Sequence, residues 1–372
     1  MSYRLAAFYF AFFVWAGLMV AYFPAYLAAR GLGAAQIAWV LALPQLARIV
    51  APAAWGWIAD RTGAQRAIVV FACLANVACF ALLPQVPGFV AILWLIGVAS
   101  VLSAAALPLV EAITLGALAG QAGRYGPIRM WGSIGFIAAV LAGGAWLDFQ
   151  SVLTLPHGLL AFALATVAVA LALPNRTAPA ARGSIRVPLD PKMAALLGAG
   201  FCMAAAHGTF HTFYTLHLQR AGYSGWLIGF LWTLGVLAEI GIFLWLPAIF
   251  RRYALSQILM ASAGLGVVRF LLIGWGVDSL ALLLAAQLMH GITFGAFHAA
   301  AIAGVHRVFP PHAQARGQTL FSSVAYGAGG AAGALAAGWA WDASGPGVAF
   351  SLSSIAAMAG LLFAYSLKRA GL

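Results

Sequence analysis

The sequence predicts an all-α polytopic membrane protein with 12 transmembrane helices in two six-helix halves, and three observations lead to this fold class. Hydrophobic residues make up 64% of the 372 residues and charged residues only 7%, whereas about a quarter of a soluble protein is charged. Apolar segments of about 20 residues, long enough to cross a bilayer as a helix, recur along the whole chain. Basic residues gather in alternate connections between these segments.

The boundaries of the apolar segments divide the chain into two halves. Residues 174–192, rich in Pro and Arg, form the longest interruption and predict a cytoplasmic linker. This linker separates a six-helix bundle over 1–173 from a second bundle over 193–372. The expected spans are 5–29, 36–58, 66–86, 88–118, 128–148, 152–173, 193–219, 225–249, 255–275, 279–306, 315–341 and 347–367.

The charge distribution predicts the orientation. The 19 Lys and Arg residues outnumber the 7 Asp and Glu residues, which gives a net charge of +12. Such an excess could indicate nucleic acid as a partner, but cytoplasmic loops of membrane proteins accumulate the same residues, so no nucleic-acid partner is expected. With both termini in the cytoplasm, only Arg30 and Arg220 of the 16 basic residues outside the spans face outward. The first span runs past 20 residues and is interpreted as a mature helix rather than a cleaved signal.

The two halves also show a sparse internal repeat. The segments that begin at Arg30 and Arg220 can be aligned at an offset of 191 residues. Gly31 is then aligned with Gly222, at the point where the first helix of each half is followed by the second. A parallel repeat of two six-helix halves predicts this coincidence.

Five ionisable residues lie within the expected spans. They are Glu111, Glu239, Arg48, Arg129 and Arg269. A charged residue at the centre of a bilayer costs roughly 2.5–3.5 kcal/mol on insertion scales, so such groups are expected to face one another or a water-filled pathway. Two other interpretations remain: structural ion pairs between helices, and for Arg129, near a helix end, snorkelling of the side chain to the interface.

Glu239 lies in the stretch WTLGVLAEIGIFLWL, where it is the sole carboxylate. A carboxyl group in an apolar setting can stay protonated and release its proton when a basic group or water approaches. Proton-coupled transport needs this property, and Glu239 is therefore the principal candidate for proton binding.

Histidines and aromatic residues supply further candidates. His207 and His211 are four residues apart and share a helix face, which permits a metal site, but no carboxylate or thiol lies at a helpful spacing and no metal is expected. His290 is assigned a hydrogen-bonding role in a cavity, and packing is the expectation for most other histidines. The aromatic residues beside His211 could stack against an aromatic ligand; they are Phe210, Phe213 and Tyr214.

The connection between the second and third spans reads GWIADRTGAQRAI and resembles the signature of the major facilitator superfamily. The match is carried by Gly56, Asp60, Arg61, Gly63 and Arg66. Ala64 and Gln65 occupy two positions that are usually basic in that signature. The resemblance implies a role for this loop in conformational gating rather than in substrate contact.

A narrower resemblance, to lactose permease and its oligosaccharide and nucleoside proton symporter relatives, covers nearly the whole chain. It rests on FYFAFFVWAGLMVAYFPAYL, RYGPIRMWGSIGF, LAEIGIF, GVVRFLLIG and LMHGITF. It implies proton-binding roles for Glu239, Glu111 and His290. It implies substrate-binding roles for Glu111, Arg129 and Arg269. Two departures are Thr293, in place of a carboxylate of the proton relay, and Phe136, in place of the tryptophan that stacks on a sugar ring.

The run HGTFHTFYTLHLQRAGYSGWLIGFLWTLGVLAEI is most similar to the 3-phenylpropionic acid permease branch of these carriers. That similarity implies an aromatic monocarboxylate as substrate, held by Arg48, Arg129 or Arg269. Phe136 and His211 complete the expected substrate-binding set. The sequence thus predicts a proton-coupled symporter of a bacterial inner membrane that uses no cofactor, acts as a monomer, and has the solute, the proton and the lipid bilayer as its partners.

Alternatives within transport are a nucleoside or sugar symporter and a metabolite or drug exporter. A membrane enzyme acting on lipid-linked substrates is disfavoured because the sequence has no Asp-rich metal motif, no nucleophile elbow and no extramembrane domain. A receptor or assembly factor without transport activity would leave the gating loop and the charges within the spans unexplained.

Overall fold

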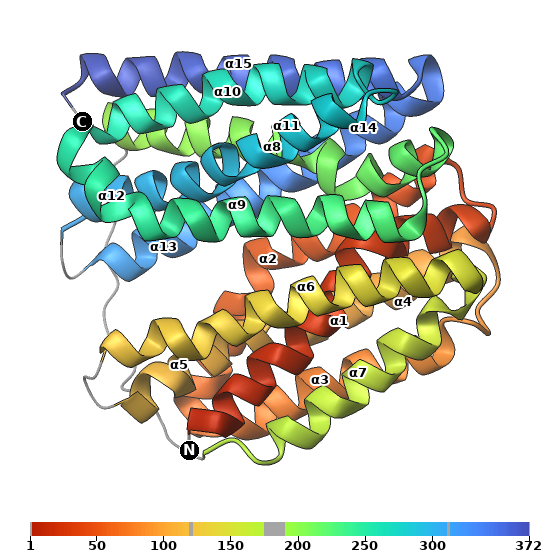
Figure 1. The fold of residues 1–372 in the computed structure, drawn as a ribbon. Helices are drawn as coiled ribbons and strands as arrows, with labels where there is room; N and C mark the ends of the chain where they lie inside the picture. The colour runs from red at the N-terminus through yellow and green to blue at the C-terminus, as the bar shows by residue number, and fades with distance from the viewer. Residues whose placement is uncertain (1, 119–121, 175–189, 311–312, 372) are drawn as a thin grey trace. The chain divides into compact units, whose positions relative to one another are not determined.

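The computed structural model describes residues 2–118, 122–174, 190–310 and 313–371, and all regular structure within them is helical (Figure 1). It has 12 helical segments long and apolar enough to cross a membrane, as predicted. Most of the predicted linker 174–192, with Arg176, Arg182 and Arg186, lies outside the described residues. The helices are α1 (Ser2–Ala29), α2 (Ala34–Thr62), α3 (Gln65–Leu82), α4 (Gly88–Ser103), α5 (Ala106–Leu118), η1 (Ala122–Arg124), α6 (Tyr125–Phe149), η2 (Val152–Thr154), α7 (Leu155–Ala170), α8 (Pro191–Arg220), α9 (Gly225–Arg252), α10 (Leu255–Trp275), α11 (Leu280–His290), η3 (Gly291–Ala296), α12 (Phe297–Val308), α13 (Gln314–Ser322), η5 (Ser323–Gly329), α14 (Gly330–Ser344) and α15 (Pro346–Arg369).

The contacts between helices divide the chain into two compact units. The first unit comprises Met1–Leu32, Val50–Gly183 and Ser224–Gly229, and the second comprises Gly33–Ile49, Ser184–Tyr223 and Phe230–Leu372. The units differ from the expected halves at two short segments, because the first part of α2 groups with the second unit and the first residues of α9 group with the first unit.

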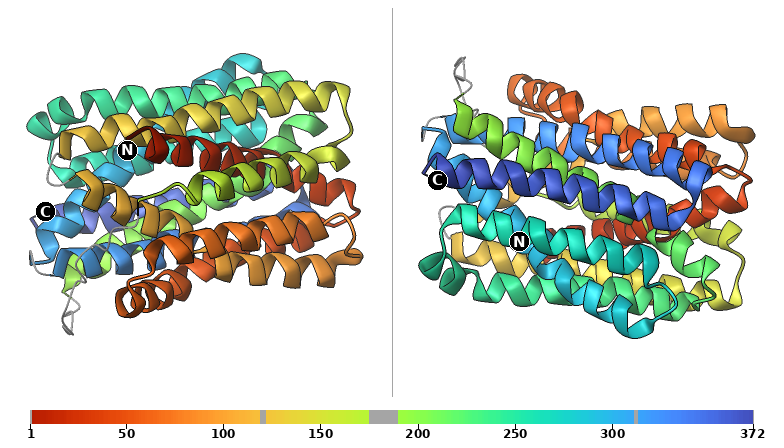
Figure 2. Two further views of the ribbon diagram at one scale, coloured as in Figure 1. Left: turned by 90° about the horizontal axis from the view of Figure 1, so that it is seen from below. Right: turned by 90° about the horizontal axis from the view of Figure 1, so that it is seen from above.

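Each unit contains the same set of helix pairings. In the first unit α1 packs against α6 and α7, and α3 packs against α4 and α7. In the second unit α8 packs against α14 and α15, and α10 packs against α11 and α15, as the views in Figure 2 show for α10 and α15. These are equivalent spans in the two halves, so the packing follows the parallel repeat that the sequence indicates.

The two halves agree most closely in local backbone geometry at the C-terminal ends of α1 and α8. Gly31 and Gly222 have φ angles of 82° and 84°, which glycine adopts without the steric cost of a Cβ. The amide of the following residue returns to the carbonyl five positions back in both cases, Leu32 to Leu27 at 3.2 Å and Tyr223 to Leu218 at 3.1 Å. This is the glycine-ended C-cap known as the Schellman motif, and it turns the chain into the next span.

Two aspartates cap the N-termini of the helices that follow these turns. In the first unit, the Asp148 carboxylate accepts hydrogen bonds from the amides of Gly225 and Trp226 at 2.5 and 2.8 Å. In the second unit, Asp342 accepts from the amides of Ala34 and Ala35 at 3.2 and 2.9 Å. A carboxylate at this position satisfies two unpaired amides and interacts favourably with the helix dipole.

Two spans that the sequence predicts as single helices change to π-helical geometry near their middle. The first change is at η3 and the second is at η5. At η3 the helix lies so close to α9 that a Cβ on Gly291 would be 2.4 Å from the Ala238 carbonyl oxygen. Single-turn π-bulges of this kind are frequent at functional sites.

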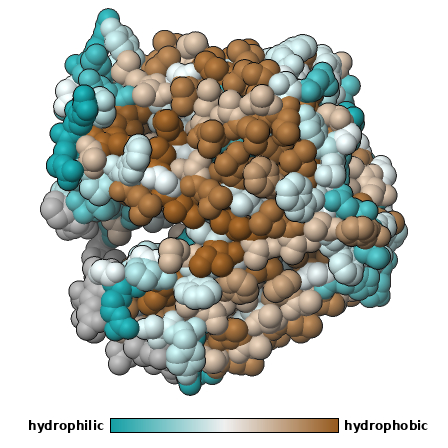
Figure 3. Space-filling model, viewed as in Figure 1, coloured by the Kyte–Doolittle hydropathy of each residue, from teal (hydrophilic) through white to brown (hydrophobic). Residues whose placement is uncertain are grey.

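The outer surface of the helices is apolar. Trp94 of α4 and Leu244 and Trp245 of α9 are more than two-thirds exposed, at 71%, 75% and 73%. Figure 3 shows hydrophobic side chains over most of the visible face, with hydrophilic residues gathered toward the ends of the helices. Such a surface requires a hydrocarbon environment, and the chain is a multi-pass membrane protein.

Candidate functional site

The predicted pair Glu111 and Arg129 comes together in the first unit. Arg129 of α6 places its Nε 3.8 Å from Oε1 of Glu111 on α5. The Glu111 side chain is 39% exposed and the Arg129 side chain 31% exposed, so neither is fully enclosed by the protein. The Arg129 guanidinium also lies over two rings of α1, 4.2 Å from the centre of Phe13 and 5.4 Å from that of Tyr9. The pair is therefore positioned by three helices of one unit.

A glycine makes room for this guanidinium. A Cβ on Gly132, one turn after Arg129, would lie 2.6 Å from Nη1 of Arg129 and 2.9 Å from the Phe13 ring. Any larger residue would displace one of these groups. The role of the pair in substrate binding stays a prediction.

Arg269 of α10 is the largest fully buried side chain in the second unit, with none of its surface exposed. The Arg269 Nε donates a hydrogen bond to the Ala286 carbonyl at 2.9 Å. Its Nη1 donates to His207 Nε2 at 3.2 Å and to Thr293 Oγ1 at 3.4 Å. Its Nη2 has no hydrogen-bond partner, and no carboxylate in the described ranges lies within ion-pairing distance of the guanidinium. A buried guanidinium with one unsatisfied donor attracts an anion.

The hydrogen bonds of His207 determine which of its ring nitrogens carries the proton. Nδ1 lies 2.9 Å from the Met203 carbonyl oxygen, which can only accept, so Nδ1 is the donor. Nε2 then has a lone pair to accept from Arg269. His207 is thus a neutral acceptor that orients the guanidinium without competing for its charge.

Aromatic rings cover Arg269. Phe210 and Phe270 lie under its guanidinium with centroid distances of 4.4 and 5.1 Å. His290 stacks on Phe294 at 5.2 Å with an angle of 10° between the ring planes, and its Nδ1 has no hydrogen-bond partner in the described part of the chain. The buried arginine therefore sits in an aromatic and weakly polar environment.

The aromatic cluster predicted beside His211 divides in the structure. Phe210 packs against the His211 ring at 5.6 Å and against Tyr214 at 4.6 Å, so both belong to the Arg269 surroundings. Phe213 stacks instead on Trp341 of α14 at 4.6 Å, because it lies on another face of α8. Stacking of a ligand on Phe213 is excluded by this packing, since the ring is completely buried.

Glu239 lies on the seam between α9 and the helix that contains His290. Gly235 of α9 faces His290, with a potential Cβ 3.3 Å from its Cδ2. One turn later Glu239 faces Gly295, whose potential Cβ would be 3.0 Å from Cγ of Glu239. The glycines bring the two helices close together. The proton-binding candidates Glu239 and His290 consequently occupy successive turns of one seam, whereas Glu111 lies in the first unit.

The remaining predicted substrate residues are distributed over both units. Arg48, near the middle of α2, has an exposed side chain. His211 is half-buried, with its ring edge against Phe294 at 6.2 Å. Phe136 is half-buried on α6, and its backbone lies against Gly17 of α1.

The predicted gating residues span the junction of α2 and α3 in the first unit. Gly56, Asp60 and Arg61 lie in the last two turns of α2, and Gly63 ends the helix with a φ of 66°. The Arg61 guanidinium lies 4.1 Å from the centre of the Trp57 ring. Arg66 donates a hydrogen bond to the Leu171 carbonyl at the end of α7. The loop is thus bound to the sixth span of its own unit.

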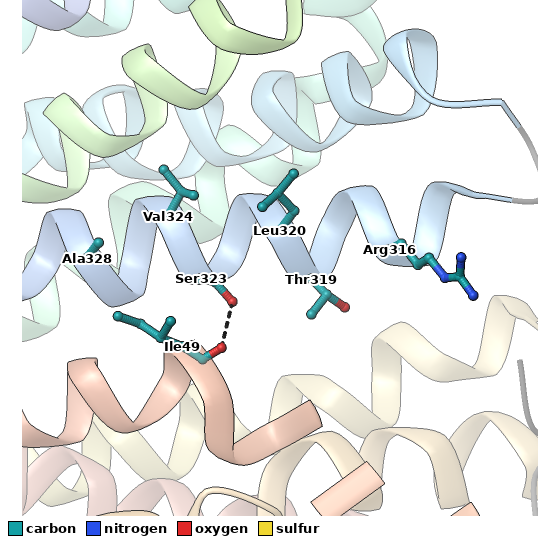
Figure 4. Close-up of a pocket in the computed structure, with 7 residues that line it drawn as sticks. All are labelled: Ile49, Arg316, Thr319, Leu320, Ser323, Val324 and Ala328. Atoms are coloured by element: carbon teal, nitrogen blue, oxygen red, sulfur yellow. Dashed lines mark hydrogen bonds between the residues drawn. The ribbon is translucent and has the colours of Figure 1, made fainter. Parts of the chain in front are cut away.

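A surface recess of about 570 Å³ lies beside α13 and η5 in the second unit (Figure 4). Ser323 donates a hydrogen bond of 3.3 Å across it to the Ile49 carbonyl of α2. The lining residues are Ile49, Arg316, Thr319, Leu320, Ser323, Val324 and Ala328. None of the residues predicted to bind substrate or proton lines this recess, so it is distinct from the Arg269 surroundings.

Comparisons with known proteins agree with this architecture. The model of the MFS_1-like family matches residues 2–352. The chain is 30% identical over 245 residues to a probable 3-phenylpropionic acid transporter of Escherichia coli, a match that covers 62% of each chain. It is 26% identical over 367 residues to maltose permease of Geobacillus stearothermophilus, covering 95% of this chain and 91% of the permease.

Solved structures show the same fold. The crystal structure of the nucleoside transporter NupG matches with a TM-score of 0.84 at 20% identity, over 99% of this chain and 98% of that chain. At this identity the likeness concerns the fold alone. The match to the E. coli relative spans less than two thirds of that protein's length.

His207 was not among the residues predicted to bind substrate or proton, and the structure places it on Arg269. A signal was present, because His207 precedes His211 by one helical turn and must share its face. The partner could not be deduced, since Arg269 lies 62 positions away on another helix.

Proposed function

The chain belongs to the MFS_1-like family, and we propose that it carries an aromatic monocarboxylate together with a proton across a bacterial inner membrane by alternating access. Proteins of this family are transporters, and the similar proteins described above transport solutes rather than catalyse reactions. The proposal concerns the kind of solute, the coupling to protons and the membrane. Both termini are proposed to lie in the cytoplasm, on the evidence of the basic residues in alternate connections.

The observation that carries the substrate class is the unsatisfied Nη2 of Arg269. The guanidinium is held by Ala286, His207 and Thr293, all of them neutral groups. A carboxylate of the solute would satisfy Nη2 and neutralise the buried charge in one step. The Phe294 ring, which is half-buried and stacks on His290 nearby, favours a solute with an aromatic group.

The name of the E. coli relative supports the same class, since it is described as a probable 3-phenylpropionic acid transporter. Two neutral solutes are the competing candidates. Maltose permease matches nearly the whole chain, and aromatic rings would also stack on the base of a nucleoside. A neutral solute, however, would leave Arg269 without an anionic partner.

Proton coupling is proposed to depend on Glu239. Its half-buried side chain lies within a membrane span, where the neutral form of a carboxyl group is favoured. Thr293 cannot replace the second carboxylate of the relay implied by the resemblance, because a hydroxyl does not release its proton in the physiological range. The net proton movement is therefore assigned to Glu239.

The test is the external pH of lightly buffered, de-energised cells that express the protein. We expect alkalinisation when 3-phenylpropionate is added, and none with maltose or uridine. The Glu239→Gln variant should lose this signal and lose concentrative uptake, yet retain exchange of solute down its gradient. Asp278→Asn, which changes a carboxylate in the turn between α10 and α11, is the matched control and should behave as the unsubstituted protein.

Three results would contradict the proposal in different ways. Alkalinisation with uridine or maltose alone would contradict the proposed aromatic monocarboxylate substrate and would support the proposed proton symport. Concentrative uptake by Glu239→Gln would remove the assignment of the proton site. Silence with all three solutes would refute proton symport of any of these classes.

A further inference from the structure

We infer that His298 and Tyr326 form a proton relay that takes the proton from the Glu239 region toward the cytoplasmic end of α12. This inference rests on the proposed proton symport. It adds two residues that neither the sequence analysis nor the resemblance assigns to the pathway. Their geometry is confined to the second unit.

The two side chains form a close hydrogen bond. Nδ1 of His298 on α12 lies 2.5 Å from the Tyr326 hydroxyl on η5, and the ring centres are 5.8 Å apart. Either group can hold the shared proton, because a hydroxyl both donates and accepts and an imidazole nitrogen does one or the other. A direct hydrogen bond of this kind provides a path for a proton between the two atoms.

Both side chains lie within membrane spans and are only half-buried. Polar side chains such as His and Tyr cost free energy when they are placed among apolar helices, whereas Leu or Phe would pack there without a polar group. Tyr326 lies within the π-helical turn η5, and turns of this kind are frequent at functional sites.

The relay is continuous with the Glu239 seam. Glu239 packs against Gly295, and His298 follows Gly295 by three residues on the same helix, approximately one turn closer to its C-terminal end. Glu239 on α9 and Arg48 on α2 are both close enough to the Tyr326 hydroxyl to interact with it electrostatically. Tyr326 therefore interacts with the Glu239 carboxyl group electrostatically and with the His298 imidazole through a hydrogen bond.

The transfer balances without any further reactant. The Glu239 carboxyl group gives its proton to the oxygen of Tyr326, and the original hydroxyl proton of Tyr326 passes to Nδ1 of His298. The imidazolium then releases the proton on Nε2 to water. Arg48 stabilises the carboxylate that remains. His290 is less suited to this task, because it is 8% exposed and the positive charge of Arg269 lies close to it.

The experiment compares two kinds of flux in proteoliposomes. Exchange of labelled 3-phenylpropionate across the bilayer requires conformational change but no net proton release, whereas uptake driven by a pH gradient requires both. We expect Tyr326→Phe and His298→Asn to keep exchange within about twofold of the unsubstituted protein and to lower gradient-driven uptake at least tenfold. His217→Asn and Tyr223→Phe are matched controls, because among the described residues both side chains hydrogen-bond only to backbone carbonyls. These variants should lower neither flux selectively.

The outcomes separate the inference from the proposed function. If the unsubstituted protein couples 3-phenylpropionate to protons and both relay variants remain fully coupled, the relay is refuted and the symport proposal stands. An equal loss of exchange and driven uptake would also refute the relay, since it would indicate a structural role. Absence of substrate-dependent proton flux in the unsubstituted protein would overturn both.

Discussion

Replacement of His207 by leucine tests whether the buried histidine positions Arg269, the arginine proposed to bind the substrate. Leucine has a similar volume and no acceptor, so Nη1 of Arg269 would retain Thr293 at 3.4 Å as its sole partner. The lost bond, 3.2 Å from Nη1 to His207 Nε2, involves a charged donor. Hydrogen bonds to charged groups contribute about 1.5–3 kcal/mol, and a factor of ten in affinity corresponds to about 1.4 kcal/mol. We expect the affinity for 3-phenylpropionate to fall about 10- to 100-fold.

The assay is equilibrium binding of labelled 3-phenylpropionate to the purified protein, with the thermal unfolding midpoint measured on the same samples. His217→Leu is the control. His217 is equally buried on α8, but its Nε2 bonds to the Ile273 carbonyl at 3.0 Å and its ring packs against Phe350 at 5.3 Å. The control should lower stability while leaving affinity unchanged. His207→Gln, which restores an acceptor, should recover part of the binding.

Equal effects of the two leucine variants on binding would refute this reasoning. They would mean that the loss of a buried histidine on α8 weakens the fold as a whole. Unchanged affinity in His207→Leu with lowered stability would likewise show that His207 supports Arg269 without positioning it for the solute.

The remaining predictions concern other parts of both units. Arg129→Lys keeps the charge but not the planar fork, and uptake kinetics should show about tenfold weaker apparent affinity; unchanged affinity would remove Arg129 from the substrate site. Asp148→Ala and Asp342→Ala each remove a helix cap and should each cost about 1 kcal/mol, seen as a lowered thermal midpoint that Asp→Asn largely spares. Gly291→Ala should impair folding or transport because its Cβ would meet a carbonyl oxygen at 2.4 Å, whereas Gly264→Ala, which meets nothing within 4 Å, should be tolerated; equal behaviour of the two would contradict the close approach of α9 and η3.

The arrangement of the spans could be predicted because the information is local. A helix that crosses a bilayer must satisfy its backbone hydrogen bonds internally and present apolar side chains along about 20 residues, and both requirements are visible in a window of sequence. Gly31 and Gly222 could be matched for the same reason, since an αL turn favours glycine wherever it occurs. The family resemblance added the pairing of Glu111 with Arg129, which the structure reproduces at 3.8 Å.

The surroundings of the candidate residues depended on tertiary structure. The sequence identified Arg269 and Glu239 as ionisable residues within apolar spans. It could not reveal that His207 accepts a hydrogen bond from the arginine or that Gly295 faces the glutamate. Nor did it separate Phe210 from Phe213, three residues apart on one helix, of which only the first lies under the guanidinium. The π-helical turns η3 and η5 were also not predicted, since the sequence pattern does not distinguish them from α-helix.

Sequence alone thus determined that this chain spans a membrane many times and which charges need an explanation, because the cost of placing a charge or a bare backbone in hydrocarbon is a property of each segment by itself. Tertiary structure decided which of these polar and charged groups pack against one another within the spans. A hydrogen bond such as that between His298 and Tyr326 joins residues 28 positions apart and forms only when two helices pack at a particular rotation and height. Those two quantities are set by side-chain packing over the whole unit, and a local sequence pattern does not contain them.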